Sequence, residues 1–177
     1  MDMISRYLTK LKNDQIMAEF YVDKYDETHY GILVDFSSDF IVIERYNNFS
    51  KYDGVVVLMR HNISRVRWSG NEIESIAMLA DTSARDSAPK INLSSITTVM
   101  QSIHAQYNHI TVHIQDMDNS VCFIGQIHEM DNETVIIHEF GTKVSLDRKY
   151  IMLSTDTITR VDANGEYENF VKQLFKR

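Results

Sequence analysis

Histidine is the residue type in this chain that most readily does chemistry, because a neutral imidazole binds transition metals. The chain has seven histidines, and most of them lie in its second half. His109 and His113 alternate with Ile110, Val112 and Ile114, which places both imidazoles on one face of a strand, opposite the apolar face. Neighbouring predicted strands carry His128 and His138, so His113, His128 and His138 could converge on a zinc or nickel ion. No helical His-x-x-x-His or His-Glu motif supports a metal site, and the alternative is that these histidines are ordinary solvent-facing residues.

A second set of residues with chemical potential is a basic stripe in the first half. It consists of Arg60, His61, Asn62, Arg65 and Arg67, with Trp68 at its end. Arginine beside aromatic rings can bind single-stranded RNA through charge and base stacking. The alternative is that the two later arginines, which alternate with apolar residues, are simply the exposed face of a strand.

Catalytic motifs are harder to find. A serine or cysteine nucleophile needs a positioned base and an oxyanion site, and the sequence has no Gly-x-Ser-x-Gly elbow. The six glycines form no phosphate-binding loop. Asp35, Asp39 and Glu44 are the best carboxylate cluster, and solvation at strand ends explains them. We therefore predict a protein that is not an enzyme and uses no cofactor.

Composition narrows the class of protein further. The chain has 177 residues, 44% hydrophobic and 24% charged, which is typical of a globular protein. Its net charge is −7, and a phosphate backbone is bound mainly by lysine and arginine, so we expect no DNA binding and regard RNA as the only nucleic-acid candidate. No apolar run reaches about 20 residues, which argues against a membrane partner and for a cytoplasmic protein. The single cysteine, Cys122, excludes an internal disulfide and reads as a small buried hydrophobe.

The strongest pattern in the sequence is an internal repeat. Gly31 and Gly125 open similar strand-like runs at an offset of 94 residues, and after one added residue the offset becomes 95. The segment Ile63-Ser64-Arg65-Val66 then matches Ile158-Thr159-Arg160-Val161, each followed by a glycine four residues after the valine. We infer two diverged copies of one module, with residues 1–80 as the first domain, 81–93 as the linker and 94–177 as the second domain.

Hydrophobic periodicity gives each copy the same order of helix, five short strands and helix. Apolar residues at helical spacing predict helices from Ile4 to Leu11 and, with Ser94 or Ser95 as cap, from Ile96 to Ile103. Short closing helices are expected over residues 72–79 and 166–175. Period-2 alternation between turn-forming residues predicts strands over 15–23, 30–36, 40–46, 54–60 and 63–68, and over 110–115, 121–128, 134–140, 150–153 and 158–161.

Modules of this kind resemble the Sm-like (Lsm) family, an N-terminal helix followed by a five-stranded SH3-like small barrel. Val57 to Val66 resembles the second Sm motif, with Arg60 at its arginine, Asn62 at its Asp/Asn and His61 in place of its glycine. The first motif is fainter, because Ser37 stands at its aspartate and Ile41 at its RNA-contacting asparagine. In the second copy Ser154 to Thr157 has replaced the arginine and the glycine of the second motif. The resemblance implies a mainly β protein of two tandem Sm-like barrels with short helices.

These observations rank three functions. The first is a non-enzymatic interaction or scaffold protein that associates with itself or with another protein, because short apolar edge strands are templates for pairing. The second is an RNA-binding adaptor of the Sm-like type that uses the first repeat. The third is a protein that binds a metal or a small ligand.

Overall fold

The computed structural model describes residues 2–81 and 88–175. The chain divides into two compact units, Met1–Pro89 and Lys90–Arg177. Of the predicted linker, residues 82–87 lie outside the described residues, and residues 88–92 form neither helix nor strand. Each unit is described by itself below.

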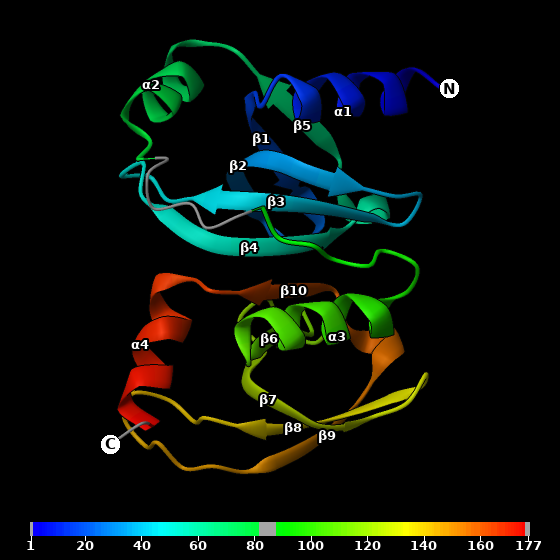
Figure 1. Cartoon of the computed structure of the whole chain (residues 1–177), viewed down its shortest axis with the longest axis vertical. Helices are drawn as coiled ribbons and strands as arrows, with labels where there is room; N and C mark the ends of the chain where they lie inside the picture. The colour runs from blue at the N-terminus through cyan, green and yellow to red at the C-terminus, as the bar shows by residue number, and fades with distance from the viewer. Residues whose placement is uncertain (1, 82–87, 176–177) are drawn as a thin grey trace. The chain divides into compact units, whose positions relative to one another are not determined.

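The first unit starts with α1 (Met3–Asn13), and the Asp2 carboxylate caps this helix by accepting the backbone N–H of Ser5 at 2.6 Å. Its strands are β1 (Met17–Val22), β2 (Glu27–Phe36), β3 (Phe40–Tyr46), β4 (Tyr52–Met59) and β5 (Arg65–Trp68). Two short 3-10 turns, η1 (Asp23–Tyr25) and η2 (Arg60–Asn62), connect strands, and α2 (Asn71–Leu79) follows β5. The strands form an antiparallel sheet in the order β5-β1-β2-β3-β4 (Figure 1).

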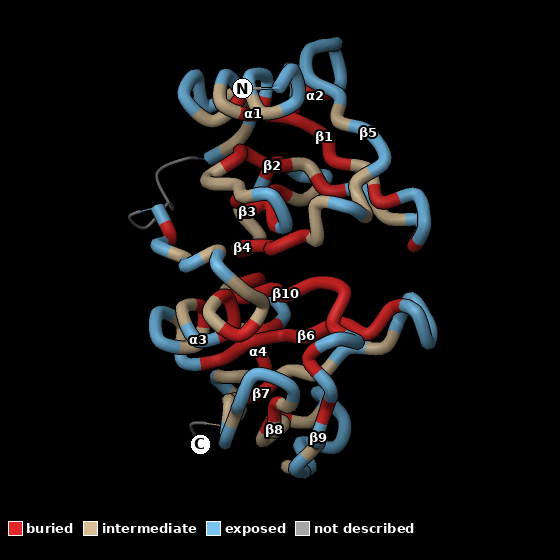
Figure 2. The backbone as a smooth tube through the Cα atoms, turned by 90° about the vertical axis from the view of Figure 1, so that its right-hand side faces the viewer, coloured by how far each residue is buried: buried red, intermediate tan, exposed pale blue. Residues whose placement is uncertain are grey.

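Alternating side chains give this sheet two apolar faces, and each face packs against one helix. On one face Phe20, Leu33 and Ile43 join Leu8 and Leu11 of α1 in a buried cluster. On the other face Met17, Ile32 and Tyr46 pack with Ile73 and Ile76 of α2. Strands β1, β3 and β4 are therefore buried along most of their length (Figure 2).

The second unit repeats this order. It contains α3 (Ile96–Tyr107), the strands β6 (Ile110–His113), β7 (Cys122–Met130), β8 (Thr134–Glu139), β9 (Tyr150–Ser154) and β10 (Arg160–Ala163), the 3-10 turn η4 (Thr155–Thr157) and α4 (Glu166–Phe175). The sequence left Ser94 and Ser95 open as caps of this helix, and the structure shows that Ser95 caps α3 in a reciprocal capping box with Thr98. The strand order, β10-β6-β7-β8-β9, is that of the first unit.

The two sheets also agree in register. Gly31 pairs with Arg45 across β2 and β3, and Gly125 pairs with Glu139 across β7 and β8. A β-bulge interrupts β2 between Leu33 and Asp35, and another interrupts β7 at the positions 94 residues later, Ile127 and Glu129. The offset read from the sequence is therefore matched by strand order, by pairing and by the position of the bulge.

Backbone crowding explains why both copies have glycine at the same point of the sheet. A Cβ on Gly31 would lie 2.6 Å from the carbonyl oxygen of Glu44 on the neighbouring strand. A Cβ on Gly125 would meet the carbonyl oxygen of His138, which is the residue equivalent to Glu44. A side chain at either position would push the two strands apart, so the module requires glycine there.

The predicted fold class is confirmed at the level of a mainly β protein with short helices, four of which lie in the described residues. In the hydrogen-bonded order, β5 and β4 stand at opposite ends of the first sheet, and β10 and β9 at opposite ends of the second. Each described sheet is therefore open in its hydrogen bonding. No helix in the described part of the chain combines the length and the apolar character needed to cross a bilayer.

Candidate functional site

The basic stripe of the first unit is divided between a turn and a strand. Arg60, His61 and Asn62 form η2, which is fixed by a hydrogen bond from the Arg60 N–H to the Asp39 carbonyl oxygen at 2.8 Å. His61 is exposed, and Arg60 and Asn62 are half-buried. Arg65 and Arg67 are exposed on one face of β5, while Val66 between them packs toward the core. The structure therefore brings the five predicted residues into one region, over consecutive elements.

Two positions singled out by the Sm-like motifs meet in this region. The Arg60 guanidinium donates to the carbonyl oxygen of Ser37 at 2.9 Å, which joins the residues compared above with the arginine of the second Sm motif and the aspartate of the first. Ile41, at the position of the RNA-contacting asparagine, is 2% exposed and belongs to the hydrophobic core. An aliphatic side chain in that place cannot hydrogen-bond to a base edge.

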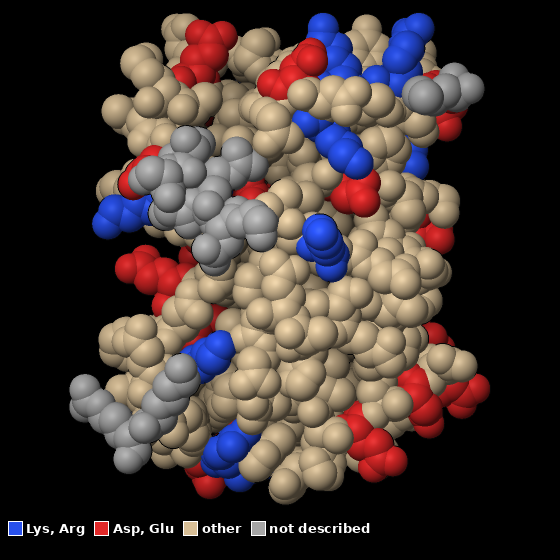
Figure 3. Space-filling model, viewed as in Figure 1, with Lys and Arg blue, Asp and Glu red and all other residues tan. Residues whose placement is uncertain are grey.

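The charges of the two β5 arginines are balanced by neighbouring carboxylates. Arg67 forms ion pairs with Glu19 at 2.5 Å and with Glu72 at 2.9 Å, and Arg65 pairs with Asp23 at 3.1 Å. The Arg65 guanidinium also lies over the Tyr21 ring, 3.9 Å from its centroid. On the face of the molecule shown in Figure 3, basic and acidic side chains are interleaved over this unit. These two arginines therefore offer little unpaired positive charge to a phosphate backbone.

Beside the stripe, α1 and β5 enclose an apolar groove with a volume of about 430 Å³. The groove is lined by Met3, Ile4, Tyr7, Leu8, Leu11, Ile41, Arg60, Ile63, Ser64, Arg65, Val66 and Trp68. We call this space the α1–β5 groove. Its deepest residues, Leu8, Leu11 and Ile41, are members of the core cluster, whereas Met3 and Ile4 remain 67% and 64% exposed. The groove thus leads from solvent directly to the hydrophobic core of the first unit.

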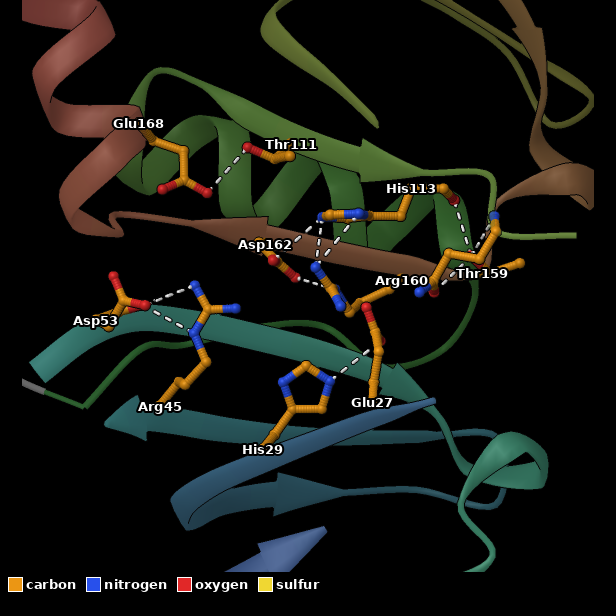
Figure 4. A network of polar contacts seen from close by, with 11 residues as sticks. Glu27, His29, Arg45, Asp53, Thr111, His113, Thr159, Arg160, Asp162 and Glu168 are labelled. Atoms are coloured by element: carbon orange, nitrogen blue, oxygen red, sulfur yellow. Dashed lines mark hydrogen bonds and ion pairs between the residues drawn. The ribbon is translucent and has the colours of Figure 1, made fainter. Parts of the chain in front are cut away.

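The second unit has a buried polar network where solvent-facing histidines were expected (Figure 4). His109 and His113 are 0% and 8% exposed, so their predicted placement on a solvent face is wrong. Arg160 Nη2 lies 2.9 Å from His113 Nε2, and Arg160 Nε donates to Asp162 Oδ1 at 2.9 Å. Thr159 Oγ1 donates to the His113 carbonyl oxygen at 3.0 Å. Both faces of β6 are covered, which strand periodicity by itself does not reveal.

The three histidines of the predicted metal site occupy two separate environments. His113 Nε2 lies 2.9 Å from the Arg160 guanidinium and 3.2 Å from the Asp162 carboxylate, and a cation beside that nitrogen opposes metal binding. The rings of His128 and His138 instead contact the exposed Tyr150 ring. His138 stacks on it at 4.2 Å with an interplanar angle of 8°, and His128 meets it edge-on at 4.9 Å. No group of three or more His, Cys, Asp or Glu in residues 2–81 and 88–175 is placed to hold a metal ion.

Burial lowers the pKa of His138, and the nearby cation Arg148 and the His128 ring lower it further.

The Tyr150 ring belongs to β9, which has β8 as its single hydrogen-bonded neighbour among the described strands. Tyr150 and Met152 are 61% and 69% exposed, and β9, with the sequence YIMLS, carries no charged residue. Cys122, expected to be buried, is exposed on β7.

Two features of the site were missed by reasoning from the sequence. The α1–β5 groove was missed because the apolar spacing from Ile4 to Leu11 was used only to predict a helix, although Met3 and Ile4 extend the apolar stripe of α1 beyond the buried residues. The network around Arg160 was missed because Arg160 was considered only as the position of the repeat that matches Arg65. The pattern Arg160-Val161-Asp162 places an opposite-charge pair on one strand face, and that signal was present in the sequence.

Comparison of the chain with protein-family models, with curated proteins and with solved structures finds no match.

Proposed function

We propose that the protein is a non-enzymatic interaction protein, built from two diverged Sm-like barrels, that works by associating with itself through the edge strand β9. Its resemblance to the Sm-like family is part of this proposal and is supported by the helix, the order of five strands and the glycine–bulge positions common to both units.

The composition of β9 is the single observation that carries the proposal. Edge strands of proteins that remain monomeric are usually protected by charged residues, by proline or by a bulge. The edge strand β5 has such protection, since it carries Arg65 and Arg67. The edge strand β9 has no charge and exposes Tyr150 and Met152. An unprotected apolar edge favours the addition of another strand, and the backbone groups on that edge supply the hydrogen bonds.

Pairing of β9 with β9 of a second copy about a two-fold axis gives a closed dimer, because each edge is then used once. Analytical ultracentrifugation over about a hundred-fold range of protein concentration tests this assembly. We expect a monomer–dimer equilibrium for the wild type. Met152→Lys places a charge on the edge and should shift that equilibrium to the monomer.

A matched control distinguishes the effect of a charge on the edge strand β9 from the effect of removing any exposed apolar side chain. Phe49 is 85% exposed in the turn between β3 and β4 and lies outside every strand, so Phe49→Lys should leave the dimer unchanged. A wild-type protein that stays monomeric throughout, or a Met152→Lys variant that dimerises normally, would refute association through β9. A trimer mass would instead favour ring assembly.

A further inference from the structure

We propose that the α1–β5 groove of the first unit is a binding site for a single-chain anionic amphiphile, that is, a long-chain carboxylate of the fatty-acid type. The site is independent of association through β9, because none of its lining residues belongs to the second unit.

Size and polarity fit the apolar tail of such a ligand. Small-molecule sites are typically concave, mostly apolar and about 300–1,000 Å³, with a few polar groups that fix orientation. The α1–β5 groove has about 430 Å³, and seven of its twelve lining residues are aliphatic side chains or methionine. Tyr7 of α1 and Trp68 of β5 touch with ring centroids 5.6 Å apart, so aromatic rings from the two walls meet. A methylene chain in this space would pack directly on the core residues Leu8 and Ile41.

Charge defines the head group. Among the described residues, the charged side chains that line the groove are Arg60 and Arg65, and no aspartate or glutamate of residues 2–81 and 88–175 lines it. Arg65 is already paired with Asp23, outside the lining, at 3.1 Å. Arg60 contacts the neutral carbonyl oxygen of Ser37, so its cationic charge is not neutralised by that contact. The exposed Asp2 carboxylate lies within electrostatic range of Arg60 but does not line the groove. A carboxylate head group next to Arg60 gains a charge-assisted hydrogen bond, whereas a cationic head group would be repelled.

The second copy of the module provides an internal comparison. The positions equivalent to Arg60, Ile63, Val66 and Trp68 are Thr155, Ile158, Val161 and Ala163. All four are buried, at 8% exposure or less, and the arginine and the tryptophan have been replaced. An open groove with a basic residue is therefore a property of the first copy and not a general consequence of the fold.

Trp68 makes the test direct, because it is the only tryptophan of the chain and lies in the groove. The probe is dodecanoate with bromine in its alkyl chain, kept below the concentration at which micelles form, since bromine quenches tryptophan fluorescence only at contact. We expect saturable quenching by brominated dodecanoate, competed by unlabelled dodecanoate. Each methylene removed from the competitor should weaken its binding roughly two-fold, as expected for a half-open apolar groove. Butanoate, which has the head group but a short tail, should not compete.

Two variants and two probes identify the head-group contact. Arg60→Gln should weaken dodecanoate about five-fold, and it should leave neutral dodecanol unchanged. Ile4→Glu places a carboxylate on an exposed turn of α1 near the helix N-terminus, where it is compatible with the helix. It should weaken dodecanoate at least ten-fold and improve binding of dodecyltrimethylammonium. Met117→Glu, an equally exposed site in the second unit, is the matched control and should behave as the wild type.

Circular dichroism of both groove variants establishes that they are folded. The proposal is overturned if brominated dodecanoate does not quench Trp68, if dodecyltrimethylammonium binds the wild type as well as dodecanoate does, or if Arg60→Gln and Ile4→Glu bind dodecanoate like the wild type. If these tests fail, the proposal of a β9 dimer is unaffected. If the wild type is monomeric, the proposal of a ligand site in the α1–β5 groove is unaffected. The two proposals can therefore be refuted separately.

Discussion

Mild acid should destabilise the second unit through one buried imidazole, His109. It immediately precedes β6 and is 0% exposed. Nδ1 lies 3.0 Å from the carbonyl oxygen of Tyr107, and Nε2 accepts the backbone N–H of Asn164 at 3.1 Å. These partners fit the neutral ring with its proton on Nδ1. Protonation of Nε2 would break the bond from Asn164 and bury a charge.

Burial is the main cause that lowers the pKa of His109, to about 4, and the nearby groups Lys172 and His104 lower it further. The hydrogen bond to the Tyr107 carbonyl acts in the opposite direction. In the unfolded chain the pKa of histidine is about 6.5, so between these values the unfolded state binds the extra proton. The stabilisation is therefore complete above about pH 6.5 and is lost as the pH falls toward about 4. Integrating from pH 7 to pH 5 gives a loss of about 2 kcal/mol.

Urea unfolding followed by far-UV circular dichroism at pH 7 and pH 5 measures this loss, and His109→Gln isolates it. Glutamine does not titrate, so the variant should lose about 2 kcal/mol less than the wild type between the two pH values, even if it is less stable at both. His61→Gln, on the exposed turn η2, is the control and should keep the wild-type pH dependence. Equal losses for wild type and His109→Gln, or an NMR titration of His109 near pH 6.5, would refute the reasoning.

Three further predictions concern the crowded glycine, the buried network and the basic stripe. Gly125→Ala places a Cβ against a carbonyl oxygen of β8 and should cost about 1–3 kcal/mol in urea unfolding; an unchanged stability would contradict the crowding argument. Arg160→Met removes the cation beside the buried Asp162 carboxylate and should lower the free energy of unfolding by about 3 kcal/mol. The double variant Arg160→Met/Asp162→Leu should recover most of this loss. A double variant no more stable than the single one would show that the charge pair is not the cause. Fluorescence anisotropy at about 0.15 M salt should show that oligouridine binds with a dissociation constant weaker than micromolar. Tighter binding that is lost in Arg60→Ala would favour the RNA-binding adaptor.

The elements with strong periodicity were predicted closely. Phe40–Tyr46 and residues 166–175 have the same bounds in the sequence prediction and in the structure. The strand predicted over 30–36 begins earlier, at Glu27, because its polar first residues continue the hydrogen-bond ladder with β1 down to the pair Val22 and Glu27. Backbone pairing extends a strand wherever a neighbour is present, whether or not its side chains alternate.

The candidate site was predicted less well. The residues of the basic stripe do lie together, since they are close in sequence and a turn and a strand keep them adjacent. His109 and His113 were wrongly expected on a solvent face, because alternation tells which residues share a face and does not tell whether another element covers that face. His128 is exposed, as expected. Charge balance was equally inaccessible, because Glu19 and Glu72 reach Arg67 from a different strand and a helix.

The sequence by itself determined the order of helices and strands, their duplication and the glycine positions, because periodicity, capping and backbone crowding act between residues that are near in the chain or fixed by strand register. The tertiary structure decided the environment of equivalent residues. Arg65 and Arg160 occupy the same place in the repeat, yet Arg65 is exposed and paired with Asp23, and Arg160 is buried between His113 and Asp162. Exposure and ion pairing depend on side chains brought close by folding, and these are the quantities that distinguish a binding surface from a core.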